Sequence, residues 1–222
     1  MKIADVSEFY APQGGGVKTY VEAKFRAAER LGHTLVVIAP GPEDRVEPRP
    51  GGRIVWVKSP AMPADPRYRM FWKAEPVWRV LDQENPDMLE GSSPWRGGWL
   101  AGQWQGKAPR ALFMHADPVA VYPQTLLGGF LSEKTIDGFF GWFWRYLRRL
   151  DASYDCCVVA GQWLADRFAR QGLERIEVVP FGIRGGEFSP DLRDETLRTS
   201  MLAACGLDSR ATLLVRLGRA PD

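Results

Sequence analysis

The sequence predicts an α/β protein built on a doubly wound parallel sheet, followed by the truncated start of a second α/β domain. Short apolar runs of strand length alternate with longer stretches of helical periodicity along most of the 222 residues. That alternation is typical of parallel strands covered by helices. In addition, a glycine-rich loop joins the first expected strand to the first expected helix. Glycines let the backbone approach a ligand closely, and the amides of a new helix can face an anion or a hydroxyl group.

The first unit of this pattern spans Ile3 to Leu31. Its opening run, Ile3–Val6, is apolar enough to be a buried strand. Three consecutive glycines (Gly14, Gly15 and Gly16) follow, and apolar residues then recur at helical spacing up to Leu31. A run of glycines alone would also fit a simple tight turn, so the loop needs support from other motifs before it indicates a ligand site.

The same alternation predicts the remaining elements of the first domain. Strands are expected at Leu35–Ala39, Arg53–Val57, Pro86–Glu90, Arg110–Met114, Asp155–Ala160 and Arg175–Val179. Helices are expected at Tyr68–Asn85, Trp95–Gln103, Val119–Phe130, Phe139–Leu150 and Gln162–Gln171, and a loop at Pro40–Gly52. Chain order alone does not give the order of the strands in the sheet.

The chain is expected to divide near residue 180. Residues 1–180 are long enough for a complete domain, and residues 181–190 form an irregular linker. Residues 191–222 carry one expected helix, Asp191–Cys205, and one expected strand, Thr212–Leu217. A parallel strand needs neighbouring strands and covering helices. We therefore expect residues 191–222 to be the incomplete beginning of a second α/β domain.

Composition excludes several classes of protein. A formal net charge of +2 is too small to indicate a nucleic-acid partner. No run of 18 apolar residues is present, so no transmembrane helix is expected. The three cysteines form neither a disulfide framework nor a metal-ligand pattern, and they fit reduced thiols in a cytoplasmic protein.

Ligands of open α/β sheets bind beyond the carboxyl ends of the strands. Four segments with functional groups follow expected strands: Gln13–Val17, Gly91–Pro94, His115–Asp117 and Gly161–Gln162. His115 is the strongest single candidate, because an imidazole titrates near neutral pH and can orient or deprotonate a hydroxyl. It could also simply hydrogen-bond a loop. The second histidine, His33, lies just past an expected helix end, where a structural role is favoured.

Four motifs in this order resemble the retaining glycosyltransferases of family 4. They are DVSEFYAPQGGGVKTYVEAK, FMHADP, VVPFGI with FSP after it, and LLVRLGR. The resemblance implies two Rossmann-like domains with the active site in the cleft between them. The chain would cover the first, acceptor-side domain and the start of the donor-binding one. The implied reaction is transfer of a sugar, with retention, from a nucleotide sugar to a sugar or lipid-linked acceptor.

The resemblance also implies roles for individual residues. His115 matches the histidine that contacts the transferred sugar, and Arg219 matches the arginine that meets the donor pyrophosphate. The complete predicted site has His115 as the catalytic residue and Gly14, Gly15, Gly16, Val17, Ser92, Ser93, Asp117 and Arg219 in substrate or donor binding. No D-x-D motif is present, which agrees with metal-independent chemistry, and no cofactor is expected.

Two other functions fit parts of the pattern. A nicotinamide-dependent oxidoreductase would need G-x-G-x-x-G and an acidic residue after the second strand, where this chain has Ala39-Pro40-Gly41. A non-catalytic binding or vestigial protein derived from a transferase stays open. We expect the 222-residue chain alone to be inactive, because half of a cleft cannot position donor against acceptor.

The aromatic and basic stretch Phe139–Arg149 has two interpretations. It could lie on a membrane surface and hold a lipid-linked acceptor, which would place the protein at the inner face of a membrane. As a helix it would be apolar almost all round, so burial between the sheet and neighbouring helices is favoured.

Overall fold

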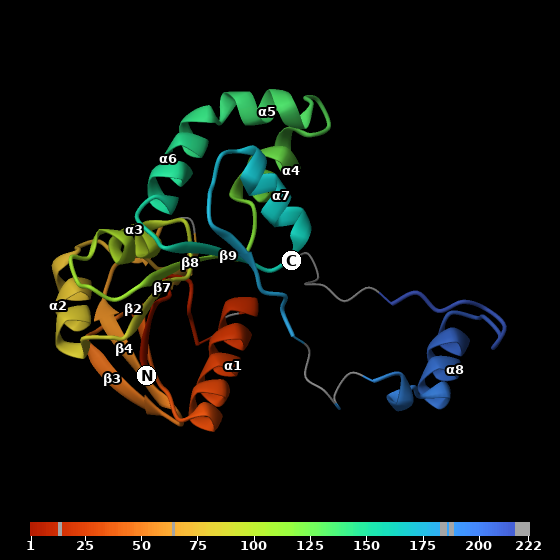
Figure 1. Cartoon of the computed structure of the whole chain (residues 1–222). Coiled ribbons are helices and arrows are strands. Elements are labelled where there is room, and N and C mark those ends of the chain that lie inside the picture. Colours follow the sequence, from red (N-terminus) through yellow and green to blue (C-terminus); the bar gives the residue numbers. More distant parts are fainter. Residues whose placement is uncertain (13–14, 64, 183–185, 187–188, 216–222) are drawn as a thin grey trace. The chain divides into compact units, whose positions relative to one another are not determined.

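The structure is a computed structural model that describes residues 1–12, 15–63, 65–182, 186 and 189–215. The chain divides into two compact units, Met1–Pro180 and Phe181–Asp222. The first unit contains a large sheet with helices against it (Figure 1). Each unit is described by itself.

The first unit is built on an eight-stranded sheet with the order β10-β9-β8-β7-β1-β2-β4-β3. Its strands are β1 (Lys2–Val6), β2 (Thr34–Gly41), β3 (Arg45–Arg49), β4 (Gly52–Lys58), β7 (Met88–Gly91), β8 (Arg110–Met114), β9 (Cys156–Val159) and β10 (Ile176–Val178). All neighbouring strands are parallel except β3, which pairs antiparallel with β4. The sheet confirms the predicted doubly wound, parallel α/β fold.

Helices pack against both faces of this sheet. The helices of the first unit are α1 (Gly16–Leu31), α2 (Glu75–Glu84), α3 (Arg96–Gln103), the π-helical turn η1 (Ala120–Gln124), α4 (Thr125–Leu127), α5 (Glu133–Phe139), α6 (Gly141–Asp151) and α7 (Gln162–Arg170). Helix α1 buries Val21, Phe25 and Ala28 against one face. Helices α2, α3, α6 and α7 bury their apolar residues in a second core cluster on the other face. None of the described helices combines the length and apolar character needed to cross a bilayer.

Helix α1 ends as the sequence predicts. Gly32 adopts a left-handed conformation (φ 68°), which glycine accepts without steric cost. The amide of His33 then donates to the Ala28 carbonyl at 2.8 Å, and the chain enters β2. Because α1 connects the parallel strands β1 and β2, it runs antiparallel to them, and its N-terminus lies at the carboxyl edge of the sheet.

The expected loop Pro40–Gly52 contains a strand that the sequence analysis missed. Strand β3 lies at the edge of the sheet and carries Pro48, which an edge strand tolerates because one side of it needs no hydrogen-bond donor. Its Glu47 accepts a hydrogen bond from the indole of Trp56, and the Arg45 guanidinium lies 4.8 Å from the centre of the same ring. These side-chain contacts hold a charged strand that has no apolar alternation.

Two predicted helices are wrong in extent. The range Tyr68–Asn85 begins in a strand: β5 (Ala61–Met62) and β6 (Asp65–Arg69) form a small antiparallel sheet, and α2 starts only at Glu75. The range Val119–Phe130 contains η1 and α4 rather than one helix, and α5 was not predicted. Helix α5 is capped by Ser132, whose hydroxyl accepts a hydrogen bond from the Thr135 amide.

The second unit contains a 3₁₀ turn, η2 (Pro190–Leu192), and helix α8 (Glu195–Ala204). The predicted helix Asp191–Cys205 is therefore interrupted, because Asp194 caps α8 through the Leu197 amide. The described part of the predicted strand, Thr212–Val215, is irregular, so that prediction is wrong there. Within the described residues of this unit no strand is present with which it could pair.

Candidate functional site

The strand ends predicted to share a site lie at one edge of the sheet. Strands β7, β1 and β2 are neighbours, and β8 follows β7, all running in the same direction. Val6 pairs with Gly91, and Gly91 pairs with Leu112. The loop after β1, the Ser92–Ser93 turn and His115 therefore emerge together at the carboxyl edge.

The N-terminus of α1 is open at this edge. Gly15 is the N-cap, no side chain caps the first amides, and a Cβ at Gly15 or Gly16 would meet nothing within 4 Å. Packing therefore does not require glycine at these positions. Lys18 closes the loop by donating to the Pro12 carbonyl at 2.7 Å. Amides at an uncapped helix start can bind an anion or a hydroxyl group.

His115 lies against aromatic rings directly after β8. Its ring is 4.6 Å from the centre of Phe113 and 5.2 Å from that of Tyr20, which it meets edge to face. Burial lowers the pKa of His115 below its usual value; Glu90 opposes this shift and Lys24 adds to it. The imidazole is therefore neutral at pH 7, a form that can both donate and accept a hydrogen bond.

A buried charge network lies beneath the edge. The Lys24 ammonium is 2.8 Å from both Asp5 Oδ2 and Glu90 Oε1. Burial alone would lower the pKa of Lys24, but the carboxylates of Asp5 and Glu90 outweigh it and raise the pKa overall. The Ser92 hydroxyl lies 2.7 Å from Asp5 Oδ1, and Tyr20 donates to Glu90 at 3.2 Å. The network joins β1, α1 and β7.

Tight packing fixes the Ser92–Ser93 turn. A Cβ on Gly98 of α3 would lie 1.9 Å from the Ser93 carbonyl oxygen, so α3 approaches the turn as closely as only glycine allows. Tyr146 donates to the Pro94 carbonyl at 2.7 Å. The Ser93 hydroxyl is buried and has no hydrogen-bond partner among the described residues. The predicted part of Ser93 in substrate binding stays a prediction.

Comparison with known proteins assigns the chain to a family. The family profile of Glycosyltransferase Family 4 matches residues 14–184, well over half of the chain. The chain belongs to glycosyltransferase family 4.

Two relatives carry the name GDP-mannose-dependent alpha-mannosyltransferase. The protein from Mycobacterium tuberculosis is 29% identical over 209 residues, which cover 89% of this chain and 52% of the relative. The protein from Corynebacterium glutamicum is 26% identical over 203 residues, covering 90% of this chain and 48% of the relative. The chain thus spans about half the length of the curated relatives it matches.

Within this family 4 domain, Asp117 has a clear supporting function. Its side chain is buried, with one carboxylate oxygen accepting the Val119 amide and the other accepting Arg167 Nε, both at 2.8 Å. Arg167 also bonds Asp137 of α5 at 2.5 and 2.6 Å. Asp117 therefore anchors the loop after β8; its predicted part in substrate binding stays a prediction.

The remaining predicted residues are placed as follows. Val17, in the first turn of α1, is half-buried. Gly14 and Arg219 lie outside the described residues. The sequence analysis missed Lys24 and Glu90, although a carboxylate at the end of an otherwise apolar strand is a signal that a charge is buried there.

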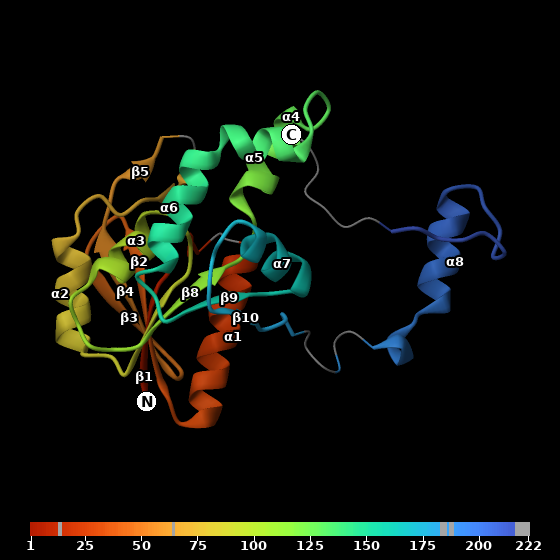
Figure 2. The same cartoon turned by 45° about the horizontal axis from the view of Figure 1, so that its top comes forward.

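An apolar groove of about 430 Å³ adjoins the edge. It begins at Trp95, two residues after Ser93, and at Pro118, next to Asp117. Side chains of η1, α4 and α6 complete it, including Tyr122, Leu126 and Trp142. Figure 2 shows α4 and α5 side by side at one end of the first unit.

Large apolar side chains around this groove are exposed. Phe130 is 88% exposed, Leu126 76% and Phe139 66%. The favoured burial of Phe139–Arg149 therefore applies to only one side of that stretch. Phe143, Trp144, Leu147 and Leu150 of α6 are buried, whereas Phe139 and Trp142 are not.

Proposed function

We propose that the protein is a retaining glycosyltransferase that uses GDP-mannose, and that Met1–Pro180 is its acceptor-side domain. The observation that carries the proposal is the meeting of Gly15–Val17, Ser92–Ser93 and His115 at one carboxyl edge in a family 4 chain. GDP-mannose is proposed as donor because both relatives are named for it.

The groups at this edge suit the recognition of sugar hydroxyls. The neutral imidazole of His115 can accept from one hydroxyl and donate to another. The uncapped amides of α1 add further polar contacts. Held together, they would fix the transferred sugar and the acceptor in a reactive geometry, and positioning supplies a large part of the rate of such reactions.

We propose that the departing diphosphate is stabilised by fixed positive charge rather than by a metal ion. Arg219 is the residue in the sequence suited to that role, because a guanidinium can bind a diphosphate through two parallel hydrogen bonds. The absence of a D-x-D motif from the sequence supports this choice.

We expect the 222-residue chain by itself not to catalyse sugar transfer. It spans about half the length of the relatives, and the donor must be held against the acceptor for transfer to occur. Nucleotide-sugar binding should be weak or undetectable by calorimetry. Micromolar binding together with transfer by the purified chain would contradict this expectation and would show that the described edge suffices.

A chimeric enzyme tests the function itself. The matching half of the Mycobacterium tuberculosis relative is replaced by residues 1–180, and transfer of radiolabelled mannose from GDP-mannose to a lipid extract is measured. We expect transfer with an α-linked product, and a strong loss on His115→Ala with little change in unfolding free energy. The control variant is His33→Ala, at the opposite end of α1.

A chimera whose transfer tolerates His115→Ala would overturn the role of His115, and a folded chimera without transfer would overturn the transferase proposal. It would favour the alternative, a non-catalytic binding protein derived from such an enzyme. An unfolded chimera is recognised by circular dichroism and replaced with one joined at residue 190.

The acceptor is proposed to be lipid-linked and to be met at a membrane surface. The apolar groove opens beside the Ser92–Ser93 turn, and exposed Leu126, Phe130 and Phe139 surround it. Exposed apolar area of this kind marks a protein or membrane contact. Arg145 and Arg149, exposed on α6, would favour an anionic lipid surface.

Vesicle sedimentation tests this contact. The chain should pellet with vesicles containing phosphatidylglycerol, and Leu126→Ser with Phe130→Ser should weaken binding by tenfold or more, since burying each side chain is worth about 1.5–3 kcal/mol. Leu31→Ser, at a 61% exposed residue of α1, is the matched control. Equal binding by both variants would refute the membrane contact.

A further inference from the structure

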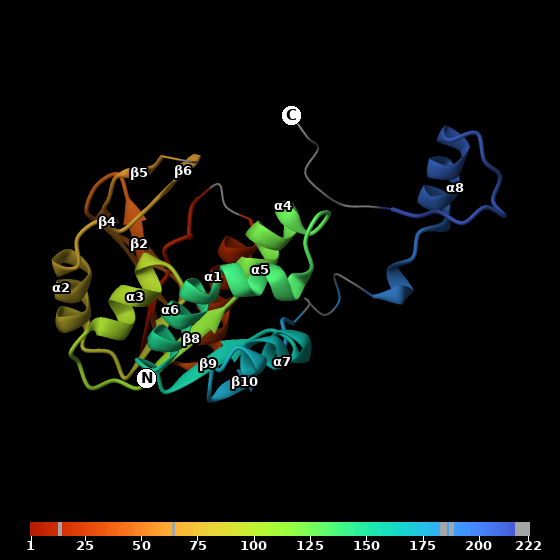
Figure 3. The same ribbon diagram turned by 90° about the horizontal axis from the view of Figure 1, so that it is seen from above.

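A second cavity, of about 700 Å³, lies at the carboxyl edge on the other side of β1 from His115. Its wall includes Lys58 and Ser59 at the end of β4, and Arg69 at the end of β6. Trp72 and Lys73, between β6 and α2, complete it. Figure 3 shows the β5–β6 hairpin beyond the ends of β2 and β4.

Hydrogen bonds tie the two sides of this cavity together. The Ser59 amide donates to the Gly41 carbonyl at 2.8 Å, which joins β4 to the end of β2. Arg69 Nη1 donates to the Ser59 carbonyl at 2.6 Å, and the Met70 amide donates to the Pro60 carbonyl at 3.2 Å. These hydrogen bonds hold the β5–β6 hairpin against the end of β4, so the wall of the cavity has a defined structure.

The cavity is positively charged. Lys58, Arg69 and Lys73 line it, and none of its described lining residues is acidic. Lys58 and Lys73 are exposed, and neither forms an ion pair with a described residue. Two ammonium groups and a guanidinium facing one cavity suit a phosphate or a carboxylate, because charge-assisted hydrogen bonds are the strong ones.

The indole of Trp72 adds a flat apolar surface beside these charges. Its side chain is 68% exposed, although its backbone carbonyl accepts from Arg96 of α3 at 3.4 Å. An exposed aromatic ring next to cations is the arrangement that binds a ring bearing an anionic group, since the ring and the charge are recognised separately.

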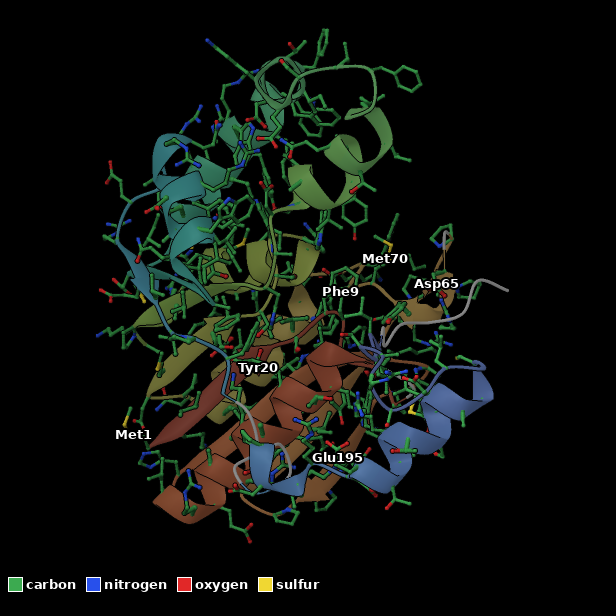
Figure 4. The ribbon with its side chains drawn as sticks, turned by 90° about the vertical axis from the view of Figure 1, so that its right-hand side faces the viewer. Met1, Phe9, Tyr20, Asp65, Met70 and Glu195 are labelled. Atoms are coloured by element: carbon green, nitrogen blue, oxygen red, sulfur yellow. The ribbon has the colours of Figure 1, made fainter. Side chains whose placement is uncertain are left out.

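The loop that carries the candidate site contacts strand β6, whose Arg69 lines the cavity. Phe9, in the loop after β1, packs edge to face on Tyr68 of β6, with ring centres 6.0 Å apart. Figure 4 labels Phe9 and Met70 on these neighbouring segments. Glu8, next to Phe9, accepts the Gly97 amide of α3 at 3.0 Å. One loop thus connects the glycine-rich turn to the wall of the cavity.

We infer that this cavity binds the anionic group of the acceptor, a phosphate or a carboxylate attached to a sugar. Three strand spacings separate β8 from β2 and four separate β8 from β4, which at about 4.8 Å each is about 15–19 Å. The acceptor is therefore an extended molecule, with the hydroxyl that receives the sugar near His115 and its charged part between Lys58 and Lys73. The inference deepens the proposed transferase function and rests on it for its biological meaning.

The test is a binding experiment that needs no turnover. The ¹⁵N-labelled 222-residue chain is titrated with inorganic phosphate, glucose 1-phosphate, glucuronate and glucose at constant ionic strength. The Trp72 indole resonance is assigned through Trp72→Phe. We expect the anionic sugars to shift this resonance and glucose to leave it unchanged. Lys58→Gln with Lys73→Gln should weaken binding by about tenfold or more, because losing even one hydrogen bond to a charged group has an effect of about tenfold.

The matched control removes two exposed lysines elsewhere, Lys107→Gln with Lys134→Gln, and should bind normally. Binding of glucose 1-phosphate alone identifies a phosphate-bearing acceptor, and binding of glucuronate alone identifies an acidic sugar. Equal binding of glucose, no binding of either anionic sugar, or loss of binding in the control pair alone would overturn the inference. None of these results depends on transfer, so the mannosyltransferase proposal stands or falls separately in the chimera.

Discussion

Replacing Lys24 by methionine should cost the folded chain about 3–5 kcal/mol of unfolding free energy at neutral pH. Lys24 Nζ lies 2.8 Å from both Asp5 and Glu90, and the side chains of those two residues are 0% and 10% exposed. Methionine keeps the length and apolar stem of lysine but leaves two buried carboxylates without their cation. Breaking a buried ion pair by removing one partner has a cost of this order.

The assay is urea unfolding followed by tryptophan fluorescence and by circular dichroism. Lys24→Arg keeps the charge and should recover most of the lost stability, and Lys107→Met, at an exposed lysine, should stay within about 0.5 kcal/mol of the parent chain. A loss below about 1 kcal/mol would refute the reasoning, since the network would then not hold β1, α1 and β7 together.

Two further predictions concern the same edge. Gly98→Ala should destabilise the chain by about 1–3 kcal/mol or more, because the new Cβ would lie 1.9 Å from the Ser93 carbonyl oxygen. The control is Gly138→Ala, whose new Cβ would meet no atom within 4 Å and which should be neutral or stabilising by up to about 1 kcal/mol. Equal losses of stability in the two variants would contradict the steric argument. Glu90→Gln should lower the pKa of His115 further, since Glu90 opposes the effect of burial on it, and an upward shift in an NMR titration would show the sign to be wrong. Because the folded chain resists protonation of His115 while the unfolded chain does not, stability should also fall as pH drops through about 6.5.

The sequence predicts the part of the fold that has apolar periodicity. The first strand was predicted because Ile3–Val6 is a short apolar run, and helix α1 because apolar residues up to Leu31 recur at helical spacing. The glycine loop between them was predicted from its three consecutive glycines. Strand β3 was not predicted, since its stability comes from the contacts of Glu47 and Arg45 with Trp56 rather than from alternation. Helix α5 was missed because its capping serine follows a stretch with no periodic apolar face.

Only the residues of the candidate site that follow expected strands could be predicted from the sequence. His115 and the Ser92–Ser93 turn follow expected strands, so their shared edge could be inferred from the parallel fold. The contacts of Lys24 with Asp5 and Glu90 could not be inferred from the sequence. They depend on β1 and β7 being neighbours in the sheet, and the order of strands along the chain does not give their order in the sheet. Gly14 and Arg219 lie outside the described residues, so their roles stay predictions.

The two sides of the carboxyl edge differ in charge, and this difference restricts the proposed acceptor. Beneath His115, Lys24 forms ion pairs with two carboxylates. The edge itself therefore presents neutral groups such as the His115 imidazole, which suit hydroxyl groups. Lys58 and Lys73, which form no ion pair with a described residue, lie across β1 in the second cavity. An acceptor whose charge sat beside its reactive hydroxyl would bring an anion to the carboxylates of the network, where like charges repel. An acceptor whose charge lies about 15–19 Å away meets neutral groups at one end and cations at the other, as the strand spacing allows.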